Sequence, residues 1–398
     1  MTNRSAGLLL SAAAGTTTMT AASAPSPLYP IYQRLWGFSA FTLTVVFALY
    51  VFALLLALLT VGSLSDRIGR RPVASVALVL LALGMLLFAT AHGVGALMLA
   101  RIVQGFAVGA STGTTTAMIL ETAPTERAGS AVSSAVPSLG IVIGAVLAGF
   151  LVQFAPLPRQ LVFWVLTAAA MLLAVLVWLI PGERPSGPVT HNSLWWELRP
   201  RAGLPAEARP TFLTLLPSMA ATWALAGLYL SLGSSVLSTV LGVQDHFVSG
   251  LVVGTLFAAG TVGALVSTFL PVEQRTFLGL AALASGVVIT LVAMLLVSQA
   301  SYVVGSAVAG LGFGASFQLA VTSLGAVAPA ARRGEIFATM YIASYLAFSV
   351  PALAAGLAVE GIGLKPTAIS YGLLEVLLIM VAIASQARRN RISEKVFR

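Results

Sequence analysis

The sequence predicts an all-α integral membrane protein with twelve transmembrane helices in two six-helix halves. Hydrophobic residues make up 58% of the 398 residues and charged residues only 8%, which is too apolar for a protein that folds in water. The apolar residues form twelve runs of about 20, the length that crosses a hydrocarbon core of roughly 30 Å as a helix. A membrane barrel would instead show alternating segments of about 10 residues.

The first half contains six of these runs. We expect spans at 7–29, 40–61, 73–92, 95–118, 130–153 and 160–181. The first run could also be a secretory signal, because Arg4 precedes an apolar stretch that ends in small residues. We favour a transmembrane helix, since loss of this run would leave an odd number of spans and disturb the charge pattern described below.

The second half follows the longest polar stretch of the chain. This stretch is rich in Pro and Arg and indicates a cytoplasmic linker. The spans expected after it are 211–234, 247–270, 276–297, 301–324, 335–358 and 366–386. The predicted parts of the chain are an N-terminal half at 1–181, the linker at 182–210, a C-terminal half at 211–386 and a basic cytoplasmic tail at 387–398.

Two segments recur at an offset of 205 residues, which indicates that the halves are repeats. The pattern Ala-Pro-x-x-Arg-x-Gly occurs at Ala123–Gly129 and again at Ala328–Gly334. At the same offset, two glycines of one half fall on two glycines of the other, namely Gly105 on Gly310 and Gly109 on Gly314. Repeats of this kind are typical of secondary transporters, in which the substrate site lies between the repeats near the bilayer midplane.

The basic residues predict the orientation. With the N-terminus inside, 17 of the 21 Lys and Arg residues fall on the cytoplasmic side, three fall outside and one, Arg101, falls within the membrane. This asymmetry predicts a multi-pass protein of the plasma membrane with both termini in the cytoplasm. The net charge of +9 is spread over many loops, which favours anionic lipid headgroups as partners and argues against nucleic acid.

Two motifs relate the chain to a known family. The loop Gly62–Arg71 reads GSLSDRIGRR and resembles the cytoplasmic signature of the major facilitator superfamily, G-x-L-x-D-R-x-G-R-R. In the fourth span, Arg101–Gly105 reads RIVQG and resembles the R-x-x-Q-G signature of the same family. With the twelve helices in two halves, the resemblance extends over nearly the whole chain. It implies the major facilitator fold and a transporter that works by alternating access, and we expect a monomer.

The resemblance implies a conformational latch at the loop between the second and third spans. Charge-assisted contacts there would favour one closed state and would have to break when the transporter opens. The alternative is that these charges only fix the topology. We expect Glu121 to pair with Arg70. The residues of the predicted latch are Gly62, Asp66, Arg67, Gly69, Arg70, Arg71 and Glu121.

The fifth span carries a glycine series that resembles the G-x-x-x-G-P-x-x-G-G signature of proton-coupled exporters in this family. Gly140, Gly144 and Gly149 match it, whereas Ala145 replaces the proline and Ala148 replaces a glycine. Small residues at this spacing let two helix backbones pack closely. The partial match favours an exporter of the drug/proton antiporter branch, and packing without any such function remains the alternative.

Two ionisable residues within the spans are candidates for proton coupling. A charged Arg101 inside the membrane is costly and suggests a function, although snorkelling or backbone carbonyls could also satisfy it. Glu375 lies near the middle of the last span, where a protonatable carboxyl could carry the coupled proton. That helix is peripheral in the family fold, so Glu375 could equally be a structural, hydrogen-bonded residue.

In the family fold, the first, fourth, seventh and tenth helices line the substrate cavity. The candidates for substrate contact are Tyr29, Arg101, Gln104, Trp223, Tyr229, Phe317 and Gln318. Aromatic and amide groups suit an amphipathic, neutral or anionic organic molecule. The first span has no internal carboxylate, which argues against a strongly cationic substrate. Each candidate could also simply pack between helices.

Other classes of function find little support in the sequence. There is no cysteine and the three histidines lack metal-ligand spacing, so we expect no metal, no cofactor and no enzyme. No nucleotide-binding motif is present, so energy would come from an ion gradient or the substrate gradient. Proton-coupled efflux of a small amphipathic organic compound is the leading hypothesis. Proton-linked or facilitated uptake of a small neutral or anionic metabolite is the alternative, and a non-transporting receptor is a remote one.

Overall fold

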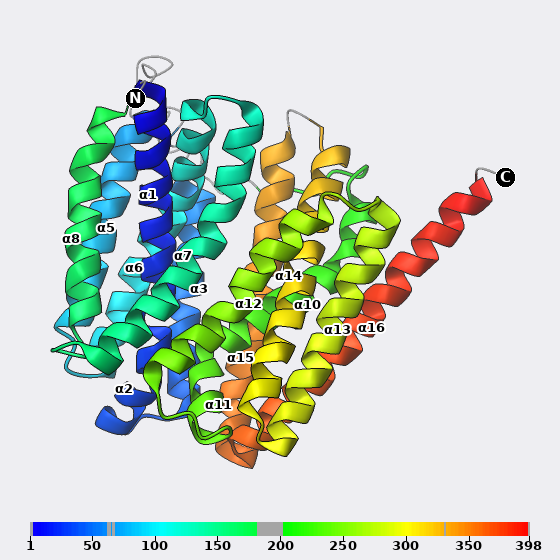
Figure 1. Cartoon of the computed structure of the whole chain (residues 1–398). Helices are drawn as coiled ribbons and strands as arrows, with labels where there is room; N and C mark the ends of the chain where they lie inside the picture. Colours follow the sequence, from blue (N-terminus) through cyan, green and yellow to red (C-terminus); the bar gives the residue numbers. More distant parts are fainter. Residues whose placement is uncertain (1–2, 62–64, 66–67, 181–201, 330–331, 397–398) are drawn as a thin grey trace. The chain divides into compact units, whose positions relative to one another are not determined.

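The computed structural model describes residues 3–61, 65, 68–180, 202–329 and 332–396. These residues form helices joined by short turns (Figure 1). The chain divides into two compact units: unit 1 is Met1–Phe38 with Val45–Arg201, and unit 2 is Ser39–Thr44 with Ala202–Arg398.

Unit 1 holds most of the predicted N-terminal half. Its α-helices are α1 (Asn3–Ser23), α2 (Tyr29–Trp36), α3 (Ala40–Val61), α5 (Arg70–Ala89), α6 (Val94–Thr122), α7 (Glu126–Phe154) and α8 (Leu161–Leu176). The first residues of α3, up to Thr44, group with unit 2. Short 3₁₀ turns lie at Ser26–Leu28 and Val177–Leu179.

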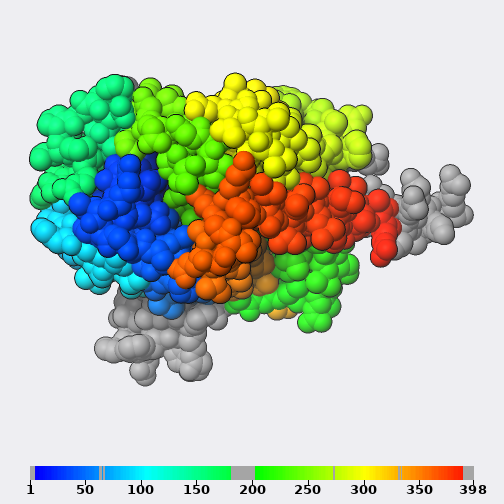
Figure 2. Space-filling view, turned by 90° about the horizontal axis from the view of Figure 1, so that it is seen from below, coloured from blue at the N-terminus to red at the C-terminus, as the bar shows by residue number. Residues whose placement is uncertain are grey.

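Unit 2 holds the predicted C-terminal half. Its α-helices are α10 (Arg209–Ser231), α11 (Gly233–Thr239), α12 (His246–Ser267), α13 (Val272–Leu296), α14 (Gln299–Val327), α15 (Arg333–Ile362) and α16 (Leu364–Val396). α15 and α16 contact each other, and the end of α16 runs out beyond its neighbours in unit 2 (Figure 1, Figure 2).

Eleven helices of the described residues are long and apolar enough to cross a membrane. They coincide with eleven of the twelve predicted spans, whereas α1, which covers the first predicted span, is not among them. α1 is long enough for a span at 21 residues, but its hydroxyl side chains, Thr16, Thr17, Thr18 and Thr20 among them, lower its hydropathy. The twelfth span therefore stays a prediction.

The two units repeat the same helix-packing scheme. In unit 1, α1 packs against α6, α7 and α8, and α5 packs against α6 and α8. In unit 2, α10 packs against α14, α15 and α16, and α13 packs against α14 and α16. Helices in the same order along each half therefore have the same neighbours, as the offset of 205 residues between the sequence motifs predicts.

Glycine seams hold corresponding helices together in the two units. In each, two glycines four residues apart lie against carbonyls four residues apart on a neighbouring helix, so closely that a side chain there would overlap the backbone. The glycines lie in α6 and α14, and the carbonyls in α3 and α12. The pairs of each glycine seam are Gly105 on Tyr50, Gly109 on Leu54, Gly310 on Leu256 and Gly314 on Gly260.

Several helix boundaries differ from the predicted spans, and in three places a helix ends early, is divided or continues further. The first predicted span runs to residue 29, but α1 ends at Ser23 because Pro25, Pro27 and Pro30 follow within seven residues and cannot continue the helical hydrogen bonds. The span predicted at 211–234 is divided at Leu232 into α10 and the short α11. α16 continues through most of the predicted tail as far as Val396.

Candidate functional site

Arg101 is the most deeply buried charged side chain in the described part of unit 1. It lies in α6 and is 1% exposed. One guanidinium nitrogen donates to the Gln104 side-chain oxygen at 2.6 Å and to the Ala22 carbonyl at 3.2 Å. The other terminal nitrogen donates to the hydroxyl of Tyr29. Three of the predicted cavity residues, Tyr29, Arg101 and Gln104, therefore form one hydrogen-bonded group, which we call the Arg101 cluster.

Three aromatic rings surround the guanidinium of Arg101. Its central carbon lies 5.4 Å from the ring centre of Tyr29, 5.2 Å from that of Tyr50 and 5.6 Å from that of Phe88. Rings at this distance attract a cation through their negative faces, and the attraction is larger where water is excluded. Neutral oxygens and aromatic faces thus stabilise the positive charge, and no carboxylate belongs to its hydrogen-bond partners in the described residues.

The end of α1 supplies the backbone of the Arg101 cluster. The Gln104 amide donates to the Ala21 carbonyl at 2.6 Å and is completely buried. Ala21 and Ala22 lie in the last turn of α1, whose carbonyls have no partner further along the helix because the helix ends at Ser23. The proline-rich break after α1 therefore leaves carbonyl oxygens that α6 binds with Arg101 and Gln104.

Two of the three predicted packing glycines bring α7 against α1. A side chain at Gly140 would overlap Met19, and one at Gly144 would overlap the Thr20 carbonyl. Gly149 is buried in the same helix. α7 therefore packs closely against the part of α1 next to the two carbonyls that accept hydrogen bonds from Arg101 and Gln104.

Beside the Arg101 cluster is a small cavity of about 150 Å³. Phe88, whose ring faces the guanidinium of Arg101, also lines this cavity, together with Tyr32, His92 and Arg159. Tyr32 lies in α2, outside the predicted span, and its hydroxyl donates to the Arg159 carbonyl at 3.4 Å. Burial raises the pKa of Tyr32 well above its ordinary value, against an opposing effect of the Arg159 charge, so Tyr32 stays a neutral donor.

Part of the predicted latch lies in the described residues. Arg70, at the start of α5, forms an ion pair with Glu121 near the end of α6, and both side chains are partly exposed. Gly69 precedes α5 with a φ of 97°, a conformation that favours glycine. Arg71 is half-buried. The latch residues Gly62, Asp66 and Arg67 lie outside the described residues.

Trp223 in unit 2 lies in an aromatic cluster. Its ring packs edge-on against Phe317 at 5.6 Å, Tyr345 at 4.8 Å and Phe348 at 5.7 Å between ring centres. The indole nitrogen is buried and has no hydrogen-bond partner in the described residues. Gln318 follows Phe317 in α14 and is half-buried. Two predicted cavity residues, Trp223 and Phe317, therefore contact each other.

Tyr229 does not join this aromatic cluster. Its hydroxyl shares a hydrogen bond of 2.6 Å with the Ser306 hydroxyl of α14, and its ring stacks on Tyr302. It is 2% exposed. The side chain of Tyr229 therefore links α10 to α14 inside unit 2.

Glu375 lies in α16 and is 3% exposed. It lines a cavity between α10, α15 and α16, and one of its carboxyl oxygens has no hydrogen-bond partner among the described residues. The structure describes no group of three or more His, Cys, Asp and Glu residues that could hold a metal ion.

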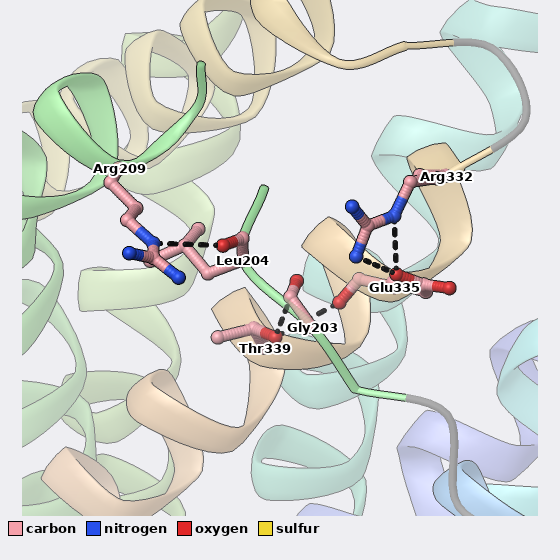
Figure 3. Close-up of polar contacts among 6 residues, drawn as sticks. All are labelled: Gly203, Leu204, Arg209, Arg332, Glu335 and Thr339. Atoms are coloured by element: carbon pink, nitrogen blue, oxygen red, sulfur yellow. Dashed lines mark hydrogen bonds and ion pairs between the residues drawn. The ribbon is translucent and has the colours of Figure 1, made fainter. Parts of the chain in front are cut away.

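The start of α15, directly after the second copy of the Ala-Pro-x-x-Arg-x-Gly motif, binds the chain that enters unit 2 (Figure 3). Arg332 of this motif pairs with Glu335 at 2.8 Å. The Gly203 amide donates to the Glu335 carbonyl at 3.4 Å, and the Thr339 hydroxyl donates to the Gly203 carbonyl at 3.1 Å. Arg209 donates to the Leu204 carbonyl, which closes the turn before α10.

Sequence reasoning missed the partners of several candidates. Tyr50 and Phe88 lie in apolar runs where aromatic residues carry no signal of a buried cation, and the carbonyls of Ala21 and Ala22 are invisible in a sequence. Ser306 could have been found, because it occupies the place of Arg101 at the offset of 205 residues.

Comparisons with known proteins relate the chain to two proteins named for drug resistance. It is 22% identical over 196 residues to the quinolone resistance protein NorA of Staphylococcus aureus, covering 48% of this chain and 50% of NorA. It is 27% identical over 159 residues to the multidrug resistance protein MdtL of Klebsiella pneumoniae, covering 38% of this chain and 39% of MdtL. The alignments thus span about half the length of these relatives or less.

The solved structures agree on the fold. Two crystal structures of a bacterial homologue of the human lysosomal transporter Spinster superpose with TM-scores of 0.72 and 0.75, at 16% and 15% identity, over 97% of this chain and 96% and 97% of theirs. The sequence also matches the Major Facilitator Superfamily over residues 11–352. The chain, an all-helical multi-pass membrane protein, therefore belongs to the Major Facilitator Superfamily and is a transporter rather than an enzyme.

Proposed function

We propose that this transporter exports a small amphipathic organic compound in exchange for protons, by alternating access of two six-helix halves. The Arg101 cluster is the observation that carries the proposal. A buried guanidinium at membrane depth is costly, and such residues mark substrate or proton pathways. The names of NorA and MdtL, proteins of quinolone and multidrug resistance, support export of an organic compound.

The charge of Arg101 favours a particular class of substrate. Its hydrogen-bond partners, Tyr29, Gln104 and the Ala22 carbonyl, are neutral, so the positive charge is not cancelled by them. The buried Nε of Arg101 makes no hydrogen bond in the described residues and is a donor for an acceptor group. A neutral or anionic molecule with an aromatic part suits such a site, and a strong cation is repelled.

The proposal includes the membrane arrangement. α1 is the twelfth span, because Arg101 and Gln104 of a spanning helix bind its carbonyls and α7 packs along it. Both termini lie in the cytoplasm, and the protein acts as a monomer in the plasma membrane with basic loops against anionic headgroups. Arg101 and Glu375 are the candidates for proton coupling, and the ion pair of Arg70 and Glu121 belongs to a latch that includes Asp66.

Transport in liposomes tests the proposal. The purified chain is reconstituted with an imposed proton gradient, and internal pH is followed together with a panel of labelled amphipathic anions, neutral compounds and cations. We expect substrate to move opposite to protons and this movement to be lost in Arg101→Ala. Ser306→Ala, which changes the corresponding position of unit 2, is the matched control and should keep most of the transport.

Three other results would contradict the proposal. Movement of substrate in the same direction as protons would indicate uptake, and substrate movement without any change in internal pH would indicate facilitated transport. Binding of a compound without flux would indicate a receptor.

A further inference from the structure

Unit 2 contains a cavity of about 370 Å³ between α10, α15 and α16. Small side chains on these helices leave the space, namely Ala224 of α10 and Ala354, Ala355 and Ala358 of α15. The three helices are long and apolar enough to span a membrane, so the cavity lies at membrane depth. A volume of this size is within the range of sites for small organic ligands, roughly 300–1,000 Å³.

The cavity wall carries one buried carboxyl group. Glu375 is 3% exposed, and its Oε1 is buried without a hydrogen-bond partner in the described residues. An unpaired carboxyl oxygen in apolar surroundings is costly, because burial removes the water that would otherwise bind it.

Two of the three hydroxyl groups of the wall are directed elsewhere, and the third, that of the exposed Ser370, makes no hydrogen bond with Oε1 of Glu375. The Tyr371 hydroxyl donates to the Ala224 carbonyl at 2.7 Å, and the Thr367 hydroxyl donates to the Gly363 carbonyl at 2.7 Å. The residues that line the cavity include no Lys, Arg or His. Glu375 therefore faces a space that offers hydrocarbon contacts on most sides and whose lining residues supply no cation for its Oε1.

We propose that this cavity binds a lipophilic amine, with the hydrocarbon part against the alanines of α15 and the ammonium group on Glu375. An ammonium donates to the carboxylate in a charge-assisted hydrogen bond, which is stronger than one from a neutral donor. Alkylamines enter the bilayer and so reach a cavity at this depth. The proposal does not rest on the proposed export, and the site is distinct from the Arg101 cluster, whose positive charge repels amines.

Direct binding of octylamine tests the proposal. The purified full chain in a non-ionic detergent is titrated with tritiated n-octylamine and bound ligand is measured by scintillation proximity. Unlabelled n-octanol and n-octanoate serve as competitors, because they share the chain length and differ only in the head group. We expect saturable binding of one octylamine per chain, without competition from octanol or octanoate at equal concentration.

Three variants locate the site. Glu375→Gln removes the charge, and Ala354→Leu fills the cavity from a position that is exposed on α15. Each should weaken octylamine binding by about tenfold or more, the effect of losing a charged hydrogen bond or the space itself. Leu357→Ala, on α15 but 59% exposed and outside the wall, should bind as the unaltered chain does.

Equal affinity in Glu375→Gln would overturn the proposal. So would competition by octanol as strong as that by octylamine, which would mean that the cavity accepts any alkyl chain, including those of lipids. Absence of saturable binding to the unaltered chain would also overturn it. If Glu375→Gln does not fold, Ala354→Leu decides, since unchanged binding in that variant places the octylamine outside the cavity.

Discussion

The two units share a scheme of helix packing and differ in where they bury an ionisable side chain. In unit 1 the fourth helix of the repeat, α6, carries Arg101, which binds Tyr29 and the end of α1. At the corresponding place in α14, unit 2 has Ser306, which binds Tyr229 of α10 with an ordinary hydroxyl hydrogen bond. The buried ionisable residue of unit 2 is instead Glu375 in its last helix, α16, whereas α8 in unit 1 has no ionisable residue.

This difference distinguishes the contacts that the repeated fold requires in both units from a feature that only one unit has. The glycine seams occur in both units, so close packing of the second and fourth helices belongs to the fold itself. A link from the fourth helix to a tyrosine near the end of the first is also shared. The charge on that link is present in one unit only, which is what a site with a specific function in unit 1 predicts.

The largest effect is expected when transport by the Arg101→Ala variant is compared with transport by the Ser306→Ala variant. Loss of the guanidinium leaves Gln104 and the Ala22 carbonyl without their donor, and transport in liposomes should fall by more than about tenfold. Ser306→Ala removes one neutral hydrogen bond, and transport should stay within about twofold of the unaltered chain. If Ser306→Ala were as inactive as Arg101→Ala, the hydrogen bond between the fourth helix and a tyrosine would be needed in both units, with or without a charged donor.

The second comparison concerns the contact between the first and fifth helices of each repeat. In unit 1 the glycine is Gly144 on α7, against the Thr20 carbonyl; in unit 2 it is Gly227 on α10, against the Phe348 carbonyl. Gly144→Val and Gly227→Val should each lower the free energy of unfolding by about 1–3 kcal/mol through overpacking, seen as a lower midpoint of thermal unfolding.

Gly113→Ala is the matched control, because nothing lies within 4 Å of the position a side chain would take there. If Gly144→Val were destabilising and Gly227→Val were not, the contact would be tight in unit 1 alone.

The third comparison measures how much the charge of Arg101 adds to the strength of the hydrogen bond that a tyrosine makes with the fourth helix of the repeat. Tyr29→Phe loses a hydrogen bond from a charged group and should cost about 1.5–3 kcal/mol of unfolding free energy, whereas Tyr229→Phe loses a neutral one worth about 0.5–1.5 kcal/mol. Thermal unfolding of the two variants side by side gives the difference. Equal losses would show that the guanidinium of Arg101 is held by its rings and other partners, not by the tyrosine hydroxyl.

The smallest effects on stability are expected at the surface ion pairs. Arg70 and Glu121 join two helices, α5 and α6, whereas Arg332 and Glu335 lie three residues apart at the start of one, α15. Both pairs are partly exposed, so each is worth less than about 1 kcal/mol in folding. Glu121→Gln should nevertheless slow transport a few-fold if the pair belongs to a latch, and Arg332→Gln should not.

Two further variants sharpen this comparison. Arg70→Glu combined with Glu121→Arg should restore part of the transport, because the opposite charges meet again. Asp66→Asn should reduce transport while the amount of protein in the membrane is unchanged. Normal transport in both Glu121→Gln and Asp66→Asn would leave these charges with a role in topology only.

Most of the fold could be predicted from the sequence, because helix length and apolar runs are fixed by the bilayer. Eleven predicted spans coincide with apolar helices, and the offset of 205 residues predicted the repeated packing. The exception is α1, where threonines lower the hydropathy and prolines end the helix early. The family and its class of function were also predicted, from the motifs at Gly62–Arg71 and Arg101–Gly105, and are confirmed by the match over residues 11–352.

The candidate site could be predicted only as single residues. Tyr29, Arg101 and Gln104 were each named, but their mutual contacts depend on the rotation of α1 and α6 about their axes, which hydropathy does not fix. The rings of Tyr50 and Phe88 were missed for the same reason. The cavity at Glu375 depends on alanines from α10 and α15 that face α16, and alanine is common in every part of this chain.

The glycine seams also constrain how a duplicated chain of this kind diverges. At Gly105 or Gly310 a larger residue would push away a whole neighbouring helix, since the obstacle is a backbone carbonyl and not a flexible side chain. No single substitution in the facing helix removes a carbonyl. A larger residue at one of these glycines therefore cannot be compensated by a second substitution, as it can where two side chains are in contact. Polar residues such as Arg101 and Ser306 lie one turn away and are free of this restriction. Substitution after a duplication is therefore easier at such polar positions than at the glycines of the two seams.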